Sequence, residues 1–240
     1  MVKISSGSYD LNKWLFGGYE SDIITTIYGP AGSGKTNFCI LASVSQAKKS
    51  KKVIYMDTEG GFSIDRFKQV AGKDYEKLSK NLLLLQPTSF SEQKKAFDSL
   101  LKELNKDSNI GLIIVDGMTM LYRLEIGDSK SDESKIHLTN KELAKQLRTL
   151  AEIARKKNIP VIVTNQIYYS FQSEDEWKAG KEKTANMVGG DLLKYWSKCI
   201  IELKNNGGRR KVILRKHRSL PEKELSFIIT SNGIRKKRLF

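Results

Sequence analysis

The sequence predicts an α/β fold with a mostly parallel central sheet, helices on both of its faces and antiparallel strands near the C-terminus. Three observations carry this prediction. Strand-like and helix-like segments alternate over the first two thirds of the chain, which is typical of parallel βαβ units. The strand-like segments are nearly continuous runs of Val, Ile and Leu, as expected when both sheet faces are buried. Paired glycines between two later strand-like segments then predict a hairpin.

The alternating elements follow one another from residue 22 to residue 165. A strand, a glycine-rich loop and a helix open the series, and further strands and helices continue it. The helices are recognised by apolar residues that recur every three to four positions. The predicted strands are 22–28, 52–57, 82–86, 110–116 and 160–165, and the predicted helices are 35–48, 64–71, 91–105 and 135–157.

The pattern changes after Gln166. Residues 167–188 mix lysines, acidic residues and aromatics without periodicity, so we expect a long loop, and such loops in compact folds are usually functional or disordered. Strands are predicted over 197–204, 209–216 and 224–230, with Asn205-Asn206-Gly207-Gly208 as the turn between the first two. Neither an internal repeat nor a linker is visible, which predicts a single domain over residues 1–240.

Composition predicts a soluble protein that meets polyanions. The chain of 240 residues carries a formal net charge of +15, which favours nucleic acid as a partner, although a lysine-rich surface of a heat-adapted protein is an open alternative. Most basic residues are lysines, which favour sequence-independent contact with phosphates. No apolar run approaches the ~20 residues that span a bilayer, and the polar start resembles no signal peptide, so we expect no membrane contact. Two cysteines suggest a reducing cytosol, and the cysteines and histidines lack metal-ligand spacing.

The most specific motif of the chain is G-x-x-x-x-G-K-[ST], the phosphate-binding loop of nucleoside triphosphatases. Its glycines let backbone N–H groups surround phosphate oxygens, at the start of a helix whose dipole attracts the same anion. Lys35 is expected to reach the β- and γ-phosphates, and the Thr36 hydroxyl to ligate Mg²⁺. The predicted nucleotide-binding residues are Gly29, Pro30, Ala31, Gly32, Ser33, Gly34, Lys35 and Thr36.

Polar residues end three of the predicted strands, where a ligand crevice forms in open α/β sheets. Asp116 is predicted to hold Mg²⁺ together with Thr36, although a strand-end Asp can also be a turn residue. Glu59 is predicted to orient the water that attacks the γ-phosphate, the alternative being an acidic helix start. Gln166 is a candidate sensor of the γ-phosphate.

These elements, in this order, resemble the RecA superfamily of recombinases, and above all the archaeal RadA and RadB families. The resemblance covers essentially the whole chain and implies a RecA-type P-loop ATPase core that uses ATP and Mg²⁺. It also implies that Glu59 activates water, that Gln166 couples nucleotide state to DNA loops, and that the flat guanidinium of Arg66 stacks on adenine. The matching segments are Ile4-Ser5-Ser6-Gly7, Gly17-Gly18, Asp57-Thr58-Glu59-Gly60, Val115-Asp116, Leu121-Tyr122-Arg123, Thr164-Asn165-Gln166, Gly189-Gly190 and Leu220-Pro221-Glu222.

Two departures from the RadA pattern favour the RadB family. The core begins at once, so we expect neither the N-terminal helical DNA-binding domain nor the linker whose Phe anchors onto the next subunit in strand-exchange enzymes. Lys216-His217-Arg218 replaces a tyrosine–aspartate segment of RadA-type recombinases. In some relatives, similar basic residues reach into a neighbour's ATP site, so Lys216 and Arg218 are candidates to act in trans on ATP, with contact to DNA as the alternative.

Two regions are candidates for DNA contact. In the loop after residue 166, aromatic side chains could stack on unpaired bases while lysines contact the phosphates. Acidic residues in the same loop weaken this interpretation, and the alternative is a lid that covers the core. In the hairpin, basic residues could bind phosphates, or could form a solvated sheet edge. The candidates are Tyr168, Tyr169, Lys178, Lys181, Lys183, Arg209, Arg210 and Lys211, with a further basic cluster over Arg235-Lys236-Lys237-Arg238.

The resulting hypothesis is a cytoplasmic, nucleoid-associated recombinase paralogue that binds ATP and DNA and assists homologous recombination and repair. We expect weak ATP hydrolysis, little strand exchange, sequence-independent DNA binding with a preference for single strands, and a possible homo-oligomer. Two alternatives remain open: an ATP-switched regulatory partner of RadA or of a junction nuclease, and a signalling ATPase similar to KaiC.

Overall fold

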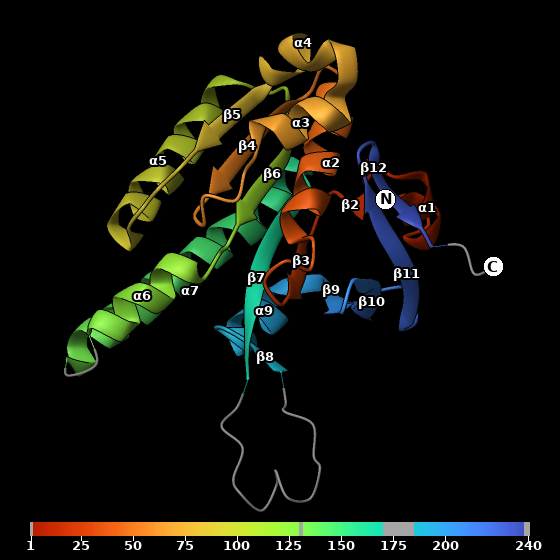
Figure 1. Ribbon diagram of the computed structural model, residues 1–240. Coiled ribbons are helices and arrows are strands. Elements are labelled where there is room, and N and C mark those ends of the chain that lie inside the picture. Colours follow the sequence, from red (N-terminus) through yellow and green to blue (C-terminus); the bar gives the residue numbers. More distant parts are fainter. Residues whose placement is uncertain (1, 130–131, 170–184, 238–240) are drawn as a thin grey trace, which may run out of the picture.

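The computed structural model describes residues 2–129, 132–169 and 185–237. Its main sheet has ten strands within this part of the chain, and Figure 1 shows helices packed on both sides of it. The strands are β1 (Lys3–Ile4), β2 (Tyr19–Glu20), β3 (Ile24–Gly29), β4 (Lys52–Asp57), β5 (Leu82–Leu85), β6 (Ile110–Asp116), β7 (Val161–Tyr169), β8 (Ala185–Met187), β9 (Ser197–Asn206), β10 (Arg209–His217), β11 (Lys223–Thr230) and β12 (Gly233–Lys236). The helices are α1 (Tyr9–Trp14), α2 (Lys35–Ala47), α3 (Ile64–Ala71), the 3-10 turn η1 (Gly72–Asp74), α4 (Tyr75–Ser79), α5 (Phe90–Lys106), α6 (Met120–Asp128), α7 (Glu133–Lys157) and α9 (Gly190–Trp196).

The strand order decides which side chains meet. Nine strands run β12-β11-β10-β9-β3-β7-β6-β4-β5, β8 pairs with β7, and β1 pairs with β2 in a separate small sheet. From β5 to β9 every neighbouring pair is parallel, whereas β9 to β12 are antiparallel. The strands β3, β4, β6 and β7 therefore end at one common edge, where a ligand crevice forms in such sheets.

The core lies on both faces of the parallel strands. In β6, Leu112 and Ile114 pack into one hydrophobic cluster with Phe38 of α2, while Ile113 and Val115 pack into another with Leu147 of α7. This alternation follows from the period of two residues in a strand. Figure 1 shows α5, α6 and α7 on one side of the sheet and α2 and α3 on the other.

The hairpin predicted at Asn205-Asn206-Gly207-Gly208 joins β9 to β10, and its turn is the two residues Gly207 and Gly208, because Asn205 and Asn206 belong to β9. Gly207 and Gly208 both have positive φ, 56° and 83°, which side chains other than glycine rarely adopt. Such a turn matches the right-handed twist of the two strands, so the hairpin keeps its register, with Arg209 opposite Asn206 and Arg210 opposite Asn205.

The structure confirms the predicted α/β class, the parallel central sheet and the C-terminal antiparallel strands. It corrects the predicted loop over 167–188, because β7 continues to Tyr169 and pairs with β8, so that Ile167 lies opposite Met187. Several elements were not predicted from the sequence: α1, α4, α6, α9, η1, β1, β2 and β12. Lys178, Lys181, Lys183 and Arg238, predicted to bind DNA or to add positive charge, lie outside the described residues. No helix in the described ranges is long and apolar enough to cross a membrane.

Candidate nucleotide-binding site

The phosphate loop joins β3 to α2 and is shaped by three glycines. A Cβ at Gly29 would lie 2.3 Å from the Leu203 carbonyl oxygen of β9, so only glycine fits between these backbones. Gly32 and Gly34 have φ of 69° and 109°, the left-handed region that glycine adopts without strain. Because Gly34 is the N-cap of α2, the loop delivers its backbone to the start of this helix, where N–H groups and the helix dipole favour an anion.

The predicted phosphate ligand Lys35 is buried in the loop that it belongs to. Its Nζ donates hydrogen bonds to the Gly29 and Pro30 carbonyl oxygens, at 3.0 and 3.1 Å, and only 7% of the residue is exposed. Burial lowers the pKa of Lys35, while the charges of Glu59 and Asp116 raise it. A phosphate group beside Nζ would supply the negative charge that this buried ammonium lacks.

The loop opens into a pocket of about 280 Å³ that gathers residues from distant parts of the chain. The buried Ser33 hydroxyl in the loop finds no hydrogen-bond partner among the described residues. Buried polar groups are usually satisfied, so an unpaired hydroxyl here fits a loop that binds phosphate oxygens. The pocket walls include Lys35, Thr36, Glu59, Gln166, Arg210 and Ile229.

The proposed magnesium residue Asp116 is fixed at the end of β6. Tyr55 donates to its Oδ2 at 2.7 Å, and Thr164 donates to its Oδ1 at 2.5 Å. Thr164 in turn accepts the Gly117 N–H at 2.8 Å. Burial, and then the charge of Asp116, raise the pKa of the Tyr55 hydroxyl well above its usual value, so this group stays a donor. These bonds orient the carboxylate of Asp116, and each of its oxygens keeps a further lone pair for metal-bound water.

A turn held by Asp57 carries Glu59. The Asp57 carboxylate accepts backbone N–H groups from Glu59, Gly61 and Phe62, at 3.3, 3.1 and 2.9 Å. The Thr58 hydroxyl donates to the Gly117 carbonyl oxygen at 2.7 Å, which ties the turn to the end of β6. The sequence analysis gave no role to Asp57, although a strand-end Asp before a Gly-Gly pair is a common turn signal. The turn therefore aims Glu59 into the pocket.

Glu59 meets Gln166, the last residue of β7 paired with the phosphate strand. Gln166 Nε2 donates to Glu59 Oε2 at 2.8 Å. On the same strand, Asn165 Nδ2 donates to the Val188 carbonyl oxygen at 2.7 Å, just after β8. The residues predicted to activate water and to sense phosphate thus touch each other, and β7, the strand that carries Gln166, continues directly into its pairing with β8.

The comparison with known proteins decides the family. The Rad51 family model matches residues 1–237. The chain belongs to the Rad51 family. A DNA repair and recombination protein RadB of Methanococcus maripaludis is 42% identical to it over 225 residues, which cover 93% of this chain and 96% of that protein. A protein of the same description from Methanocaldococcus jannaschii is 42% identical over 224 residues, covering 93% of this chain and 98% of that protein.

A solved structure agrees with this assignment. The crystal structure of the RadB recombinase is similar to the chain with a TM-score of 0.75 and 36% identity, over 96% of this chain and 98% of that one. The RecA-type core and the RadB branch, both predicted from the motifs, are therefore confirmed. The roles of individual residues in this Rad51-family chain stay predictions, and the structure shows where each of those residues lies.

Arg66, predicted to stack on adenine, lies next to the phosphate pocket. Its Nε donates to Asn37 Oδ1 at 2.7 Å, and Asn37 lines the pocket. Its Nη1 donates to the Ser231 carbonyl oxygen and to Gln69 Oε1, both at 2.9 Å. A guanidinium held by three hydrogen bonds from two of its nitrogens presents a fixed plane, which is the property that a stacking residue needs.

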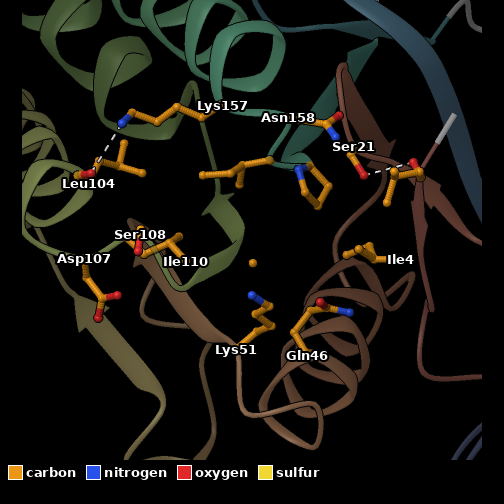
Figure 2. A pocket seen from close by; sticks show the side chains of 14 residues that line it. Ile4, Ser21, Gln46, Lys51, Leu104, Asp107, Ser108, Ile110, Lys157 and Asn158 are labelled. Atoms are coloured by element: carbon orange, nitrogen blue, oxygen red, sulfur yellow. Dashed lines mark hydrogen bonds between the residues drawn. The ribbon is translucent and has the colours of Figure 1, made fainter.

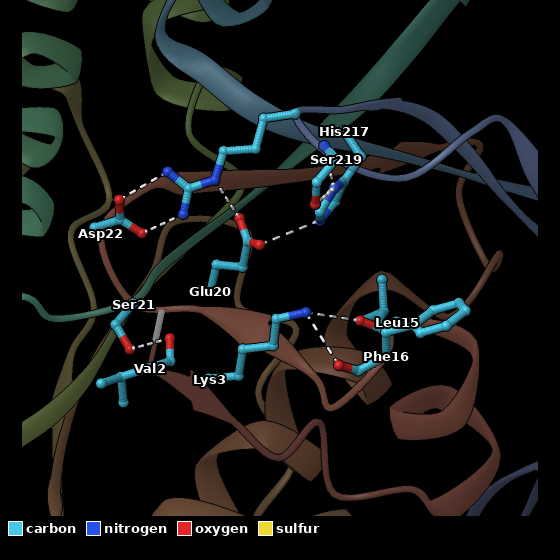
Figure 3. Close-up of polar contacts among 10 residues, drawn as sticks. Val2, Lys3, Leu15, Phe16, Glu20, Ser21, Asp22, His217 and Ser219 are labelled. Carbon is cyan, nitrogen blue, oxygen red and sulfur yellow. Dashed lines mark hydrogen bonds and ion pairs between the residues drawn. The ribbon is translucent and has the colours of Figure 1, made fainter.

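Lys216 and Arg218 lie far from the pocket of their own chain. Arg218 makes a two-bond ion pair with Asp22, at 2.8 and 2.5 Å, and its Nε donates to the buried Glu20 carboxylate at 2.7 Å (Figure 3). Lys216 Nζ donates to the Lys194 carbonyl oxygen at 2.7 Å. Asp22 precedes β3 whereas the phosphate loop follows it, so Arg218 lies at the opposite edge of the sheet. Contact of Lys216 or Arg218 with a nucleotide would need a neighbouring chain.

A hollow of about 420 Å³ also lies at this opposite edge. Figure 2 shows Lys51, Gln46 and Ile110 around it, at the end of α2 and the start of β6. Lys157 reaches across one wall toward the Leu104 carbonyl oxygen, at 3.5 Å. Ligands of parallel α/β sheets bind at the carboxyl ends of the strands, so this hollow has no place in the nucleotide site of the family fold.

A basic groove lies on the antiparallel strands, away from this hollow. It encloses about 900 Å³, and lysines from β9, β10 and the end of β12 border it together with Arg209. Lys204 lies opposite Lys211, which lies opposite Ser226, so the lysines form a row across the strands. The sequence analysis missed Lys204, because its place in the row depends on strand register. Tyr168, predicted to stack on bases, is 44% exposed on β7.

Proposed function

We propose that this Rad51-family chain binds ATP with Mg²⁺ and binds DNA, and that it assists homologous recombination and repair as a RadB-type paralogue. The observation that carries the proposal is that Lys35, Glu59 and Gln166 meet around one pocket of about 280 Å³ at the phosphate loop. Similarity to the RadB proteins supports it, since those proteins are described as DNA repair and recombination proteins.

The pocket residues divide the chemistry of phosphoryl transfer among them. Lys35 would neutralise charge on the β- and γ-phosphates, and Glu59 would accept a hydrogen bond from the attacking water. Mg²⁺, held by Thr36, phosphate oxygens and water beside Asp116, would offset the charge that develops on the transferred group. Gln166 holds one oxygen of the Glu59 carboxylate in the structure, and the other oxygen can accept a hydrogen bond from water.

Slow hydrolysis is expected if the site needs a basic group that the same chain does not bring to it. Arg218, the candidate to act in trans, is held by Asp22 and Glu20 of its own chain. We propose that a second chain completes the site, so specific ATPase activity should be low and should rise with protein concentration. A high rate that is independent of concentration would contradict shared sites.

The basic groove is the proposed DNA surface. Lys204, Lys211 and Lys237 line it from three neighbouring positions, although Glu224 pairs with Lys211 at 2.8 Å. Lysine rows bind phosphates without reading bases, which supports sequence-independent binding. Tyr168 lies exposed on β7 and could stack on an unpaired base.

Two substitutions test nucleotide use. Lys35→Ala should abolish heat from Mg²⁺-ATP in calorimetry, whereas Glu59→Gln should keep binding and lose hydrolysis, because it keeps the shape and removes the base. If Lys35→Ala bound ATP as well as the parent chain, the proposed site would be wrong.

Salt dependence tests the DNA surface. Changing Lys204, Lys211 and Lys237 together to Ala should lower affinity for single-stranded DNA and reduce the slope of log affinity against log salt by about two, at ~0.7 per phosphate contact. The control changes the exposed Lys95, Lys102 and Lys106 of α5 to Ala, which removes the same charge from another surface. If both variants lost the same affinity for DNA, the groove would not be a specific contact surface, and binding would depend only on the overall positive charge.

A second candidate function is an ATP-switched regulator of RadA or of a junction nuclease. The Glu59–Gln166 hydrogen bond favours it, because nucleotide that displaces this bond would act directly on β7 and on its pairing with β8. Loss of repair in cells that carry Glu59→Gln supports the hydrolytic role, whereas retention of repair supports the switch.

A further inference from the structure

The β9–β10 hairpin and β11 form one wall of the nucleotide pocket. Leu203 of β9 packs its carbonyl oxygen against Gly29, and Asn205 Nδ2 donates to the Gly32 carbonyl oxygen at 3.4 Å. The Ile229 side chain of β11 would lie 3.0 Å from a Cβ at Gly34. The phosphate loop is therefore covered along its length by the antiparallel part of the sheet.

Arg210 enters the pocket from this wall. It lies opposite Asn205 on β9 and opposite Phe227 on β11, one residue inside the hairpin turn. Side chains alternate along a strand, so Arg210 shares the face of Val212, which is buried in the core cluster beneath α2. Arg209, its neighbour in sequence, is exposed on the other face.

Arg210 makes no ion pair with a carboxylate of the described residues. Its Nε is buried and finds no hydrogen-bond partner among the described residues. Two other basic residues of β10 do have carboxylate partners, since Lys211 pairs with Glu224 at 2.8 Å and Arg215 pairs with Glu202 at 2.6 Å. An inward-facing, unpaired guanidinium beside a phosphate loop would gain charge-assisted hydrogen bonds from an incoming phosphate.

We propose that Arg210 binds the terminal phosphate of ATP within its own chain. The inference rests on the proposed ATP binding and adds a phosphate ligand that the loop motif does not contain. The terminal phosphate is favoured because Glu59 and Gln166, which would face it, line the same pocket as Arg210. Arg210 also borders the basic groove, so a DNA phosphate is the competing ligand that the experiment must separate.

The experiment measures binding of a non-hydrolysable ATP analogue and of ADP, each with Mg²⁺, by calorimetry on the whole chain. Arg210→Gln should weaken the ATP analogue at least tenfold and ADP less than twofold, because one charge-assisted bond to the third phosphate is lost. Arg210→Lys should recover part of the loss. Arg155→Gln on the exposed face of α7 is the control, with the same charge change away from the pocket and the groove, and should bind both nucleotides like the parent chain.

Other outcomes would overturn the proposal. Unchanged nucleotide affinity in Arg210→Gln, with weaker single-stranded DNA binding, would make Arg210 a DNA ligand instead. Equal weakening of the ATP analogue and ADP, with a lower Tm, would mean that Arg210 shapes the wall and does not touch the third phosphate. If the parent chain bound neither nucleotide, the proposed function itself would fail and the inference with it.

Discussion

Arg218→Met should destabilise the fold by about 2–3 kcal/mol, because it leaves a buried carboxylate without its positively charged partner. Only 2% of the Glu20 side chain is exposed, and Arg218 Nε lies 2.7 Å from its Oε2. A second basic group, His217, is 3.9 Å from Glu20 (Figure 3). Burial lowers the pKa of His217, so this imidazole is neutral at pH 7 while Arg218 is in place.

The magnitude follows from the exposure of the three partners. Breaking a fully buried ion pair costs about 3–5 kcal/mol, but 27% of the Arg218 side chain is exposed, so water recovers part of that cost. Asp22 is 37% exposed, and its pair with Arg218 adds at most about 1 kcal/mol. Methionine keeps the apolar stem of the side chain, so the loss reports mainly on charge.

Urea unfolding followed by circular dichroism measures the change, read as a lower midpoint at constant m. Lys211→Met is the control, since the Lys211–Glu224 pair is 46% and 55% exposed and should contribute less than about 0.5 kcal/mol. The double variant Glu20→Gln/Arg218→Met should lose less stability than the sum of the single variants, because Gln leaves no charge behind. Strict additivity, or a loss below about 0.5 kcal/mol in Arg218→Met, would refute the argument.

Three further predictions follow from single contacts. His217 has a pKa lowered from the ordinary 6.5, so below about pH 6.5 the unfolded chain binds the extra proton and stability falls, whereas His217→Gln should lose this slope in unfolding curves from pH 7 to 5. Tyr55→Phe leaves Asp116 Oδ2 without its 2.7 Å donor, and should cost about 1–2 kcal/mol in urea unfolding and weaken Mg²⁺-ATP in calorimetry; an unchanged midpoint would show that this bond adds nothing. Gly117→Ala would place a Cβ 2.6 Å from Glu59 Cγ, at a φ of 92° that residues other than glycine rarely adopt. We therefore expect ATPase activity to fall while Lys35-dependent binding of ATP persists. Full ATPase activity would show that catalysis does not depend on the position of Glu59.

The sequence predicted those parts of the site that depend on local chemistry. The phosphate loop is contiguous, and each of its glycines is required by a backbone position within the loop or against one strand. Asp116 and Glu59 follow buried strands, so parallel pairing alone brings them to one edge. Glu59 and Gln166 are 107 positions apart in the sequence and are hydrogen-bonded in the structure, as expected for residues at the ends of parallel strands.

Features that depend on the register between strands could not be predicted from the sequence. Arg209, Arg210 and Lys211 are three consecutive cations, and the pleat alone turns the middle one inward. The partners of Arg218 are 196 and 198 positions away, so no local pattern reveals them. Helix α6 was missed because only Leu121 of its nine residues is buried, which leaves no apolar stripe to recognise.

The direction of β10 separates the two arginines that could reach a nucleotide. Strand β9 runs parallel to β3 and β10 returns antiparallel, so Arg210 starts at the edge that holds the phosphate loop and Arg218 ends at the other. The two are eight positions apart, about 27 Å at ~3.4 Å per residue, so both cannot contact one nucleotide from the same chain. A defect of Arg210→Gln in nucleotide binding should therefore persist in dilute, monomeric protein, whereas any direct effect of Arg218 on hydrolysis should appear only at concentrations where chains associate.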